Sequence, residues 1–185
     1  GYVAFDAGTA TLPGGTSVEA GWVNTNDKFA DVTFTHGFPT APVVLTQSQT
    51  VRGDDAVVTR QRDLTAESTS IRLQESEANG AHTYEAVGYV AVEPGTDSLA
   101  GDAIEAGRTG HVVTDAWHHI DFERWYYEPA FVADLQTYHG ADTAGLRYRN
   151  LTGSGVDVRV EEERSGDAET NHTNETVGYL VAETA

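Results

Sequence analysis

The most regular pattern in the chain is the alternation of apolar and polar residues expected of β-strands. Thr69–Gln74 alternates with Ile71 and Leu73 on one face, and Val156–Val160 alternates strictly. Clusters of Gly, Asn, Asp and Ser separate such runs at intervals near the ~8–12 residues typical of β-sandwiches. Almost nothing has the periodicity of an amphipathic helix, so the pattern predicts an all-β fold. The other predicted strands are Pro42–Thr50, Val57–Leu64 and Glu85–Val92.

The chain contains two copies of one sequence pattern, offset by 86 to 90 residues. Such a period indicates a repeat of one structural unit. We therefore predict two tandem antiparallel β-sandwich units of about six strands each, at residues 10–96 and 97–185. The matches are Glu19-Ala20-Gly21 with Glu105-Ala106-Gly107, Arg60-x-Arg62 with Arg147-x-Arg149, Glu75 with Glu162, His82-Thr83-x-Glu85 with His172-Thr173-x-Glu175, and Gly88–Glu93 with Gly178–Glu183.

The first residues resemble the end of a unit. Gly1–Phe5 matches Gly88–Val92 at its first four positions. We therefore predict that residues 1–9 are the final strand of a preceding copy, and that the chain is a fragment of a longer array. Such a strand can pair within the chain or be donated to a neighbour by β-augmentation. Chance similarity of one short strand is the alternative.

The amino-acid composition limits the classes of binding partner that this chain can have. The chain has 29 acidic and 11 basic residues, a net charge of −18, and Lys28 is its one lysine. This charge argues against nucleic acid and anionic membranes as partners, because both attract basic surfaces. No apolar run approaches the ~20 residues of a membrane helix, so no membrane insertion is expected. Carboxylates hold water and cations in concentrated salt, which favours a halophilic protein over an ordinary acidic secreted domain.

The closing strands resemble those of the H-type lectin domain. A Pro-Val-Val strand, an arginine-bearing strand and an Ile-Arg-Leu strand precede Val87–Ala91, and Val177–Val181 is its second copy. The resemblance covers Pro42–Glu93 and Pro129–Glu183. It implies a six-stranded antiparallel sandwich, often trimeric, that binds N-acetylgalactosamine or related sugars. Tyr89 and Tyr179 stand where that family has tryptophan, and its sugar-contacting residues are not carried over.

Candidate ligand-binding residues come from the repeated polar positions and from one aromatic segment. Guanidinium and carboxylate groups bond directionally to hydroxyls, although a cross-strand ion pair explains the same residues. A histidine in a loop can form a hydrogen bond to a sugar, or it can be a capping or solvent-exposed residue. An exposed aromatic ring can stack on a sugar ring. The candidates are Arg60, Arg62, Glu75, His82, Arg147, Arg149, Glu162 and His172 from the repeats, and Trp117, His119, Trp125 and Tyr127 from the aromatic segment.

Other chemistry is less well supported. His118 and His119, near Asp121 and Glu123, resemble a metal site, but adjacent strand residues point to opposite faces, so no metal and no cofactor is predicted. No nucleophile elbow, phosphate loop or zinc-protease motif is present, so no catalytic residue is predicted and the chain is not expected to be an enzyme. Three tripeptides have the form of N-glycosylation acceptors, at Asn150, Asn171 and Asn174.

These features predict an extracellular or cell-surface module from a high-salt environment, or a virion-surface one. The first hypothesis is carbohydrate binding for adhesion, with glycans or glycoproteins as partners and avidity from repetition. The alternative is a structural repeat of a surface filament, stalk or viral fibre that self-associates as a trimer or filament, including by strand exchange. The third hypothesis is that the chain is an accessory domain of a secreted hydrolase.

The composition predicts salt-dependent stability. Because the net charge is −18, removing salt should expose self-repulsion and loosen the fold. We expect the melting temperature to rise from ~0.1 M to molar NaCl. Circular dichroism in a salt series tests this, and an unchanged melting temperature would contradict the halophilic interpretation.

Overall fold

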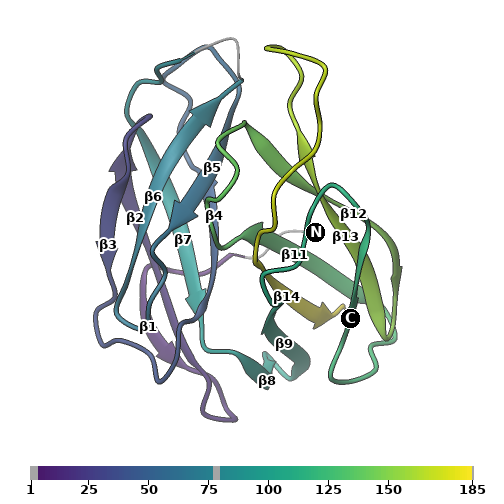
Figure 1. Cartoon of the computed structure of the whole chain (residues 1–185). Helices are drawn as coiled ribbons and strands as arrows, with labels where there is room; N and C mark the ends of the chain where they lie inside the picture. Colours follow the sequence, from purple (N-terminus) through teal and green to yellow (C-terminus); the bar gives the residue numbers. More distant parts are fainter. Residues whose placement is uncertain (1–3, 77–79, 185) are drawn as a thin grey trace.

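The computed structural model describes residues 4–76 and 80–184. These residues form 14 strands in four antiparallel sheets, as the all-β prediction required (Figure 1). Two sheets have four strands and two have three. No helix in the described residues is long and apolar enough to cross a membrane.

The first seven strands, here called the first half, make one four-stranded and one three-stranded sheet. The four-stranded sheet has the order β1-β2-β7-β4 and the three-stranded sheet has the order β3-β6-β5. The strands are β1 (Gly8–Thr11), β2 (Ser17–Thr25), β3 (Ala30–Thr33), β4 (Val43–Ser48), β5 (Val57–Arg62), β6 (Ser68–Glu75) and β7 (Glu85–Val92).

The last seven strands, the second half, repeat this arrangement strand for strand. Their sheets have the orders β8-β9-β14-β11 and β10-β13-β12. Even the register agrees, since Arg60 lies opposite Arg72 and Arg147 lies opposite Arg159. The strands are β8 (Gly95–Leu99), β9 (Asp102–Arg108), β10 (His118–Asp121), β11 (Pro129–Leu135), β12 (Ala144–Thr152), β13 (Gly155–Glu162) and β14 (Val177–Glu183).

The described strands differ from the prediction in two details. Each half has seven strands and not about six, because a short first strand, β1 or β8, pairs with the edge of the four-stranded sheet. β8 also crosses the boundary predicted after residue 96. Of the predicted leftover strand, residues 1–3 lie outside the described residues, residues 4–7 form no strand, and residues 8 and 9 belong to β1.

Each half encloses its own apolar core between its two sheets. In the first half, Val44, Ile71, Leu73 and Val87 are fully buried. The second half has a larger and more aromatic core, because Tyr126, Phe122 and Phe131 join its valines. The strand residues that point away from these cores either form the contact between the two halves or lie on the outer surface.

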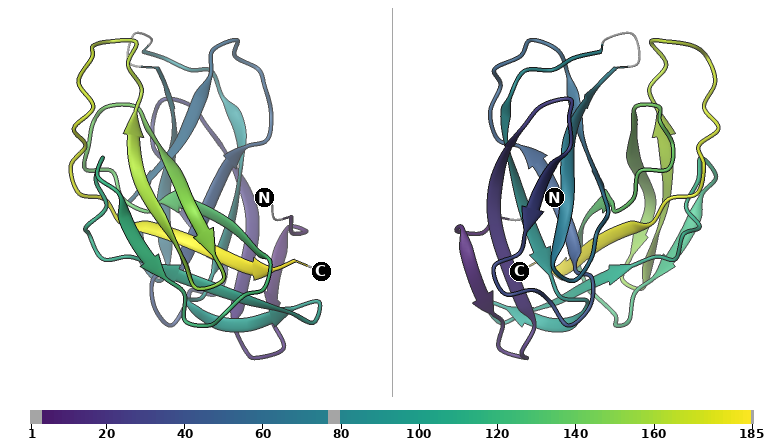
Figure 2. Two further views of the ribbon diagram at one scale, coloured as in Figure 1. Left: turned by 90° about the vertical axis from the view of Figure 1, so that its right-hand side faces the viewer. Right: turned by 60° about the vertical axis from the view of Figure 1, so that its left-hand side comes forward.

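A third apolar cluster joins the two halves. It lies between the outer faces of the two four-stranded sheets, which pack near β1, β8 and β9 (Figures 1 and 2). Equivalent positions meet there: Val18 of β2 corresponds to Ile104 of β9, and Val90 of β7 corresponds to Leu180 of β14. The halves therefore bury related apolar patches against each other.

Polar side chains of the second half cover the open edge of β4. The Gln136 carboxamide accepts from Val44 N at 2.9 Å and donates to Val44 O at 2.8 Å. The Asp134 carboxylate accepts from Thr46 N at 3.0 Å. An uncovered strand edge is a template for unwanted pairing, and these bonds close this edge.

Removing one of these caps should destabilise the contact between the halves. Gln136→Ala leaves Val44 N buried without an acceptor, which costs about 1–3 kcal/mol. Gln49 is the equivalent residue of the first half and is exposed, so Gln49→Ala should change the unfolding free energy little. Chemical denaturation in molar NaCl measures both variants, and equal stabilities would show that the cap is not a stabilising element.

Candidate functional site

Several predicted ligand-binding residues form buried clips in each half. In the first half, His82 lies between two glutamates: its Nδ1 is 2.7 Å from Glu75 and its Nε2 is 3.3 Å from Glu85. Glu85 also accepts from the Thr50 hydroxyl and from the amides of Arg52 and Gly53. The histidine and both glutamates are buried. This clip joins β6, β7 and the loop after β4.

The second half builds the same clip from equivalent residues. His172 Nδ1 is 2.6 Å from Glu162, and its Nε2 is 3.2 Å from Glu175. Glu175 accepts from the Thr137 hydroxyl and from the amides of His139 and Gly140. A Cβ at Gly140 would lie 2.2 Å from the His172 ring, and Gly53 has the same relation to His82. The repeated glycines therefore leave room for the histidine.

Hydrogen bonds set the ionisation of each clip. Burial alone would raise the pKa of Glu175, but bonds from His172, Thr137 and two amides outweigh it and hold the pKa at about 2. The pKa of Glu85 is also about 2, because its equivalent donors outweigh burial. Burial would lower the pKa of His172, and its bonds to Glu175 and Glu162 raise it above 6.5. In the second half, the clip therefore favours a charged Glu175 carboxylate beside a protonated His172 imidazole.

Arg60, a predicted ligand-binding residue, is a buried contact between the halves. Its side chain is fully buried and its Nη2 lies 3.3 Å from Glu175. It also donates to the carbonyl oxygens of Asp142 at 2.9 Å and Gly140 at 3.3 Å. The predicted cross-strand pair with Glu75 is wrong, because Glu75 instead bonds to His82 within its own half.

The other predicted arginines lie on the outer faces of the three-stranded sheets. Arg62 stacks 4.0 Å from the Phe29 ring centre, and Arg149 stacks 4.2 Å from Trp117. Arg147 pairs with Glu161 and is 63% exposed. These arginine–aromatic stacks are exposed to solvent, unlike the clips.

The aromatic segment is divided between the core and the surface. Tyr126 is fully buried, whereas Trp125 and Tyr127 are 71% and 85% exposed. His119 lies 2.8 Å from Asp157 and 3.4 Å from Asp121. The structure therefore leaves Trp125 and Tyr127 accessible, but it does not bring them together with the buried clips.

The three predicted glycosylation residues are exposed. Asn150 adopts a positive φ of 51° at the end of β12, and its amide donates to Asp157 at 2.8 Å. The Asn174 amide donates to His111 O at 3.2 Å. Glycosylation at these positions stays a prediction.

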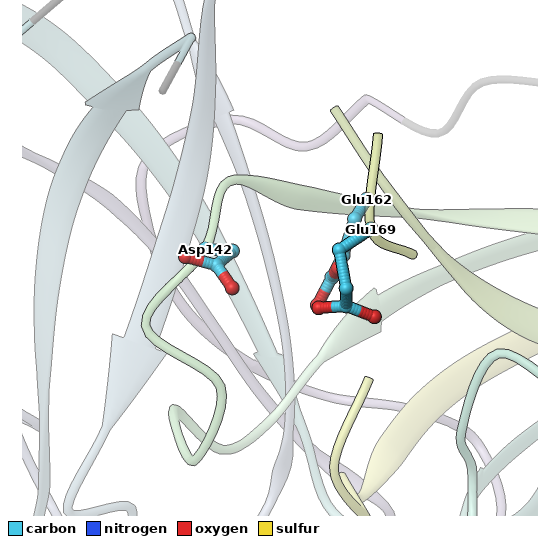
Figure 3. A group of neighbouring side chains, drawn as sticks. All are labelled: Asp142, Glu162 and Glu169. Carbon is cyan, nitrogen blue, oxygen red and sulfur yellow. The ribbon is translucent and has the colours of Figure 1, made fainter. Parts of the chain in front are cut away.

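Asp142, Glu162 and Glu169 are the carboxylates best placed to meet at a cation. One oxygen from each lies within 4.8 Å of the others, and Figure 3 shows them converging from separate segments. Carboxylate oxygens suit hard cations. Glu162 is already bonded to His172, however, so the group has a structural explanation as part of the clip.

A cleft of about 650 Å³ lies between the halves and is lined by residues of both, including the bonded pair Thr46 and Asp134. Trp22 and Tyr148 are its large exposed aromatic residues, at 63% and 53% exposure. The cleft combines aromatic rings with amide and guanidinium groups. Its polar and aromatic lining includes Trp22, Gln47, Gln49, Phe131, Arg147 and Tyr148.

The cleft includes one predicted ligand-binding residue, Arg147, and two that the sequence pattern did not indicate. Trp22 lies on β2 and Tyr148 on β12, and an aromatic residue in a strand fits a core position equally well. Which face of these strands stays exposed depends on how the two halves pack. The alternation of residues within one strand does not encode that packing.

A search of known proteins finds one informative similarity. The chain is 37% identical over 186 aligned residues to halomucin from Haloquadratum walsbyi. The alignment covers 97% of this chain and 2% of that protein, so the chain spans a small fraction of this much longer relative. No family model and no solved structure matches the chain. The proposed relation to H-type lectins is therefore not confirmed.

The clip makes the stability depend on pH. Since the pKa of Glu175 is about 2 in the folded protein and 4.5 in its unperturbed state, its contribution is present above pH 4.5 and is lost as the pH falls toward 2. Glu175→Gln should therefore lower the melting temperature at neutral pH and make the acid-induced decrease less steep. Thermal melts from pH 7 to pH 2 test this.

Glu67→Gln serves as the control for this measurement, because Glu67 is exposed. That variant should retain the neutral-pH melting temperature and the acid profile of the original chain. If Glu175→Gln behaves in the same way as the control, the clip does not carry acid sensitivity.

Proposed function

We propose that this chain is a non-enzymatic, carbohydrate-binding segment of a haloarchaeal cell-surface protein. The similarity to halomucin supports a haloarchaeal surface protein, and the acidic composition supports a high-salt environment. For this chain itself, the proposed role is adhesion or attachment. Glycans or glycoproteins of neighbouring surfaces are the proposed partners.

The cleft between the halves is the observation that carries carbohydrate binding. Trp22 offers an exposed ring that can stack on the apolar face of a sugar. Gln47, Gln49 and Arg147 line the same cleft and supply donors and acceptors for hydroxyl groups. Concave sites with aromatic rings and a few polar groups are typical of small-ligand binding.

The cleft replaces the repeated histidines and acidic residues as the proposed binding site. His82, His172, Glu75 and Glu162 are buried and bonded to one another within the clips. Exposing them to a sugar would break those bonds, which a buried charged group does not tolerate without large cost. The ligand is therefore assigned to the surface that the packing of the halves creates.

A glycan array in molar NaCl tests this proposal. We expect saturable binding to a defined sugar, with about tenfold or greater weakening by Trp22→Ala, because loss of a stacking ring costs on the order of 1–2 kcal/mol. Trp125→Ala is the control, since Trp125 is equally exposed but does not line the cleft. Binding that depends on Trp125 and not on Trp22 would place the site elsewhere.

A structural role is the second candidate, supported by the bonds between the halves. Arg60, Gln136 and Asp134 each cross from one half to the other. Such cross-links fix the relative orientation of the halves, as a spacer in a surface filament requires. Absence of binding to any glycan, with the fold intact, would favour this role.

A further inference from the structure

The cleft between the halves is the first of three adjoining cavities. A second cavity, of about 330 Å³, shares Gln47 and Leu146 with the cleft. A third, of about 340 Å³, shares Val58 and Gly145 with the second. Each shared boundary contains residues of both halves. The three cavities therefore make one continuous depression between the halves, here called the groove.

Two strand edges border the middle of the groove. Residues 57–59 of β5 and residues 144–146 of β12 all line the second cavity. Only alternate residues of a strand share a face, so three consecutive lining residues show that the edge of each strand meets the cavity. In the described residues β5 and β12 are the outermost strands of their sheets. Their edges carry backbone donors and acceptors that no further strand pairs with.

The groove is nearly neutral where it begins, although the chain has a net charge of −18. Asp134 and Arg147 are the charged residues among the described lining of its first two cavities. Much of the remaining polar lining consists of hydroxyl and amide groups, such as those of Thr46, Gln47 and Thr59. Glutamates at residues 161–163 line the third cavity, so the far end would repel an acidic chain. These groups suit an uncharged ligand rich in hydroxyls.

Gly145 leaves space in the middle of the groove. A Cβ at Gly145 would meet no atom within 4 Å, and its φ is not in the left-handed region. The equivalent residue of the first half is Val58, since Val58 lies opposite Gln74 and Gly145 lies opposite Glu161 in matching registers. The strand position therefore accepts a side chain, and neither backbone conformation nor packing requires glycine there. The free space at Gly145 belongs to the groove.

We propose that the groove binds an extended, uncharged polysaccharide chain along its length, and not a single terminal sugar. This inference rests on the proposed carbohydrate binding at the cleft and names the class of ligand. One sugar ring stacks on Trp22 in the cleft. The following rings lie between the edges of β5 and β12 and pass over Gly145. The open backbone groups of these edges and the Gln47 amide bond to sugar hydroxyls.

The shape of the groove favours a chain over a chain end. A site for a terminal sugar is closed beyond that sugar, whereas the cleft continues into the second and third cavities. Each further ring that enters the groove adds contacts to the same molecule. Affinity should therefore increase with the number of sugar rings until the groove is filled.

Isothermal titration calorimetry in molar NaCl tests this dependence on length. The probes are size-graded neutral gluco-, manno- and galacto-oligosaccharides, from the monosaccharide to the hexasaccharide. We expect the affinity for at least one series to increase about tenfold or more from the shortest to the longest member, which corresponds to about 1.4 kcal/mol. Trp22→Ala should weaken every member of that series, because all of them use the cleft.

A side chain placed at Gly145 should block the groove without changing the cleft. Gly145→Trp should reduce the affinity for the hexasaccharide to that for the monosaccharide and leave the monosaccharide unaffected. Gly145→Val, which copies Val58, is a smaller block and should reduce the increase with length in part. Gly80→Trp is the matched control, since a Cβ at the exposed Gly80 also meets no atom within 4 Å and Gly80 lines none of the three cavities. Circular dichroism checks that each variant keeps its β structure.

The outcomes separate this inference from the proposed function. Binding that depends on Trp22 but is equal for short and long sugars, or that survives both Gly145 variants, would overturn the inference and leave carbohydrate binding at the cleft in place. A preference for acidic over neutral oligosaccharides would also overturn it. Absence of binding to sugars of every length would overturn the proposed function and this inference with it.

Discussion

Each half depends on a buried glutamate that gathers donors from three segments of the chain. Glu85 and Glu175 receive bonds from a hydroxyl, two loop amides and an imidazole. A buried carboxylate is costly unless it is fully bonded. The loop after the fourth strand, the sixth strand and the closing strand must therefore keep their positions together. Residues 138–142, the loop that meets the other half, are shaped by this requirement.

A second pair of buried glutamates explains the closing tyrosines. Tyr89 donates to Glu19 at 2.9 Å and Tyr179 donates to Glu105 at 2.9 Å. Burial and the neighbouring carboxylate raise the pKa of Tyr89 to about 12, which keeps the phenol protonated as a donor. Gly21 leaves room for the Tyr89 ring, since a Cβ there would lie 2.6 Å from its hydroxyl. Tryptophan has no hydroxyl at that place, so the tyrosines suit this core.

The sequence predicts the interior of each half better than the surface between them. The β-strands and the paired Glu-Ala-Gly segments are local features, and repetition makes them visible. Arg60 and Arg147 show the limit: they are the same residue at the same position, yet one is buried and the other is exposed. The difference comes from which half lies next to each, and no pattern within a repeat encodes it. Trp22 and the cleft were missed for the same reason.

The unequal use of equivalent surfaces is the feature that gives the chain its open sites. If the halves packed with full twofold symmetry, Arg147 and Gln49 would be bonded as Arg60 and Gln136 are. Instead Arg60 and Gln136 are bonded to the other half, whereas Arg147 and Gln49 line the cleft between the halves. A repeat that bonded both pairs would bury its arginines and offer a ligand no surface. The asymmetry between the halves therefore links their stability to their capacity to bind.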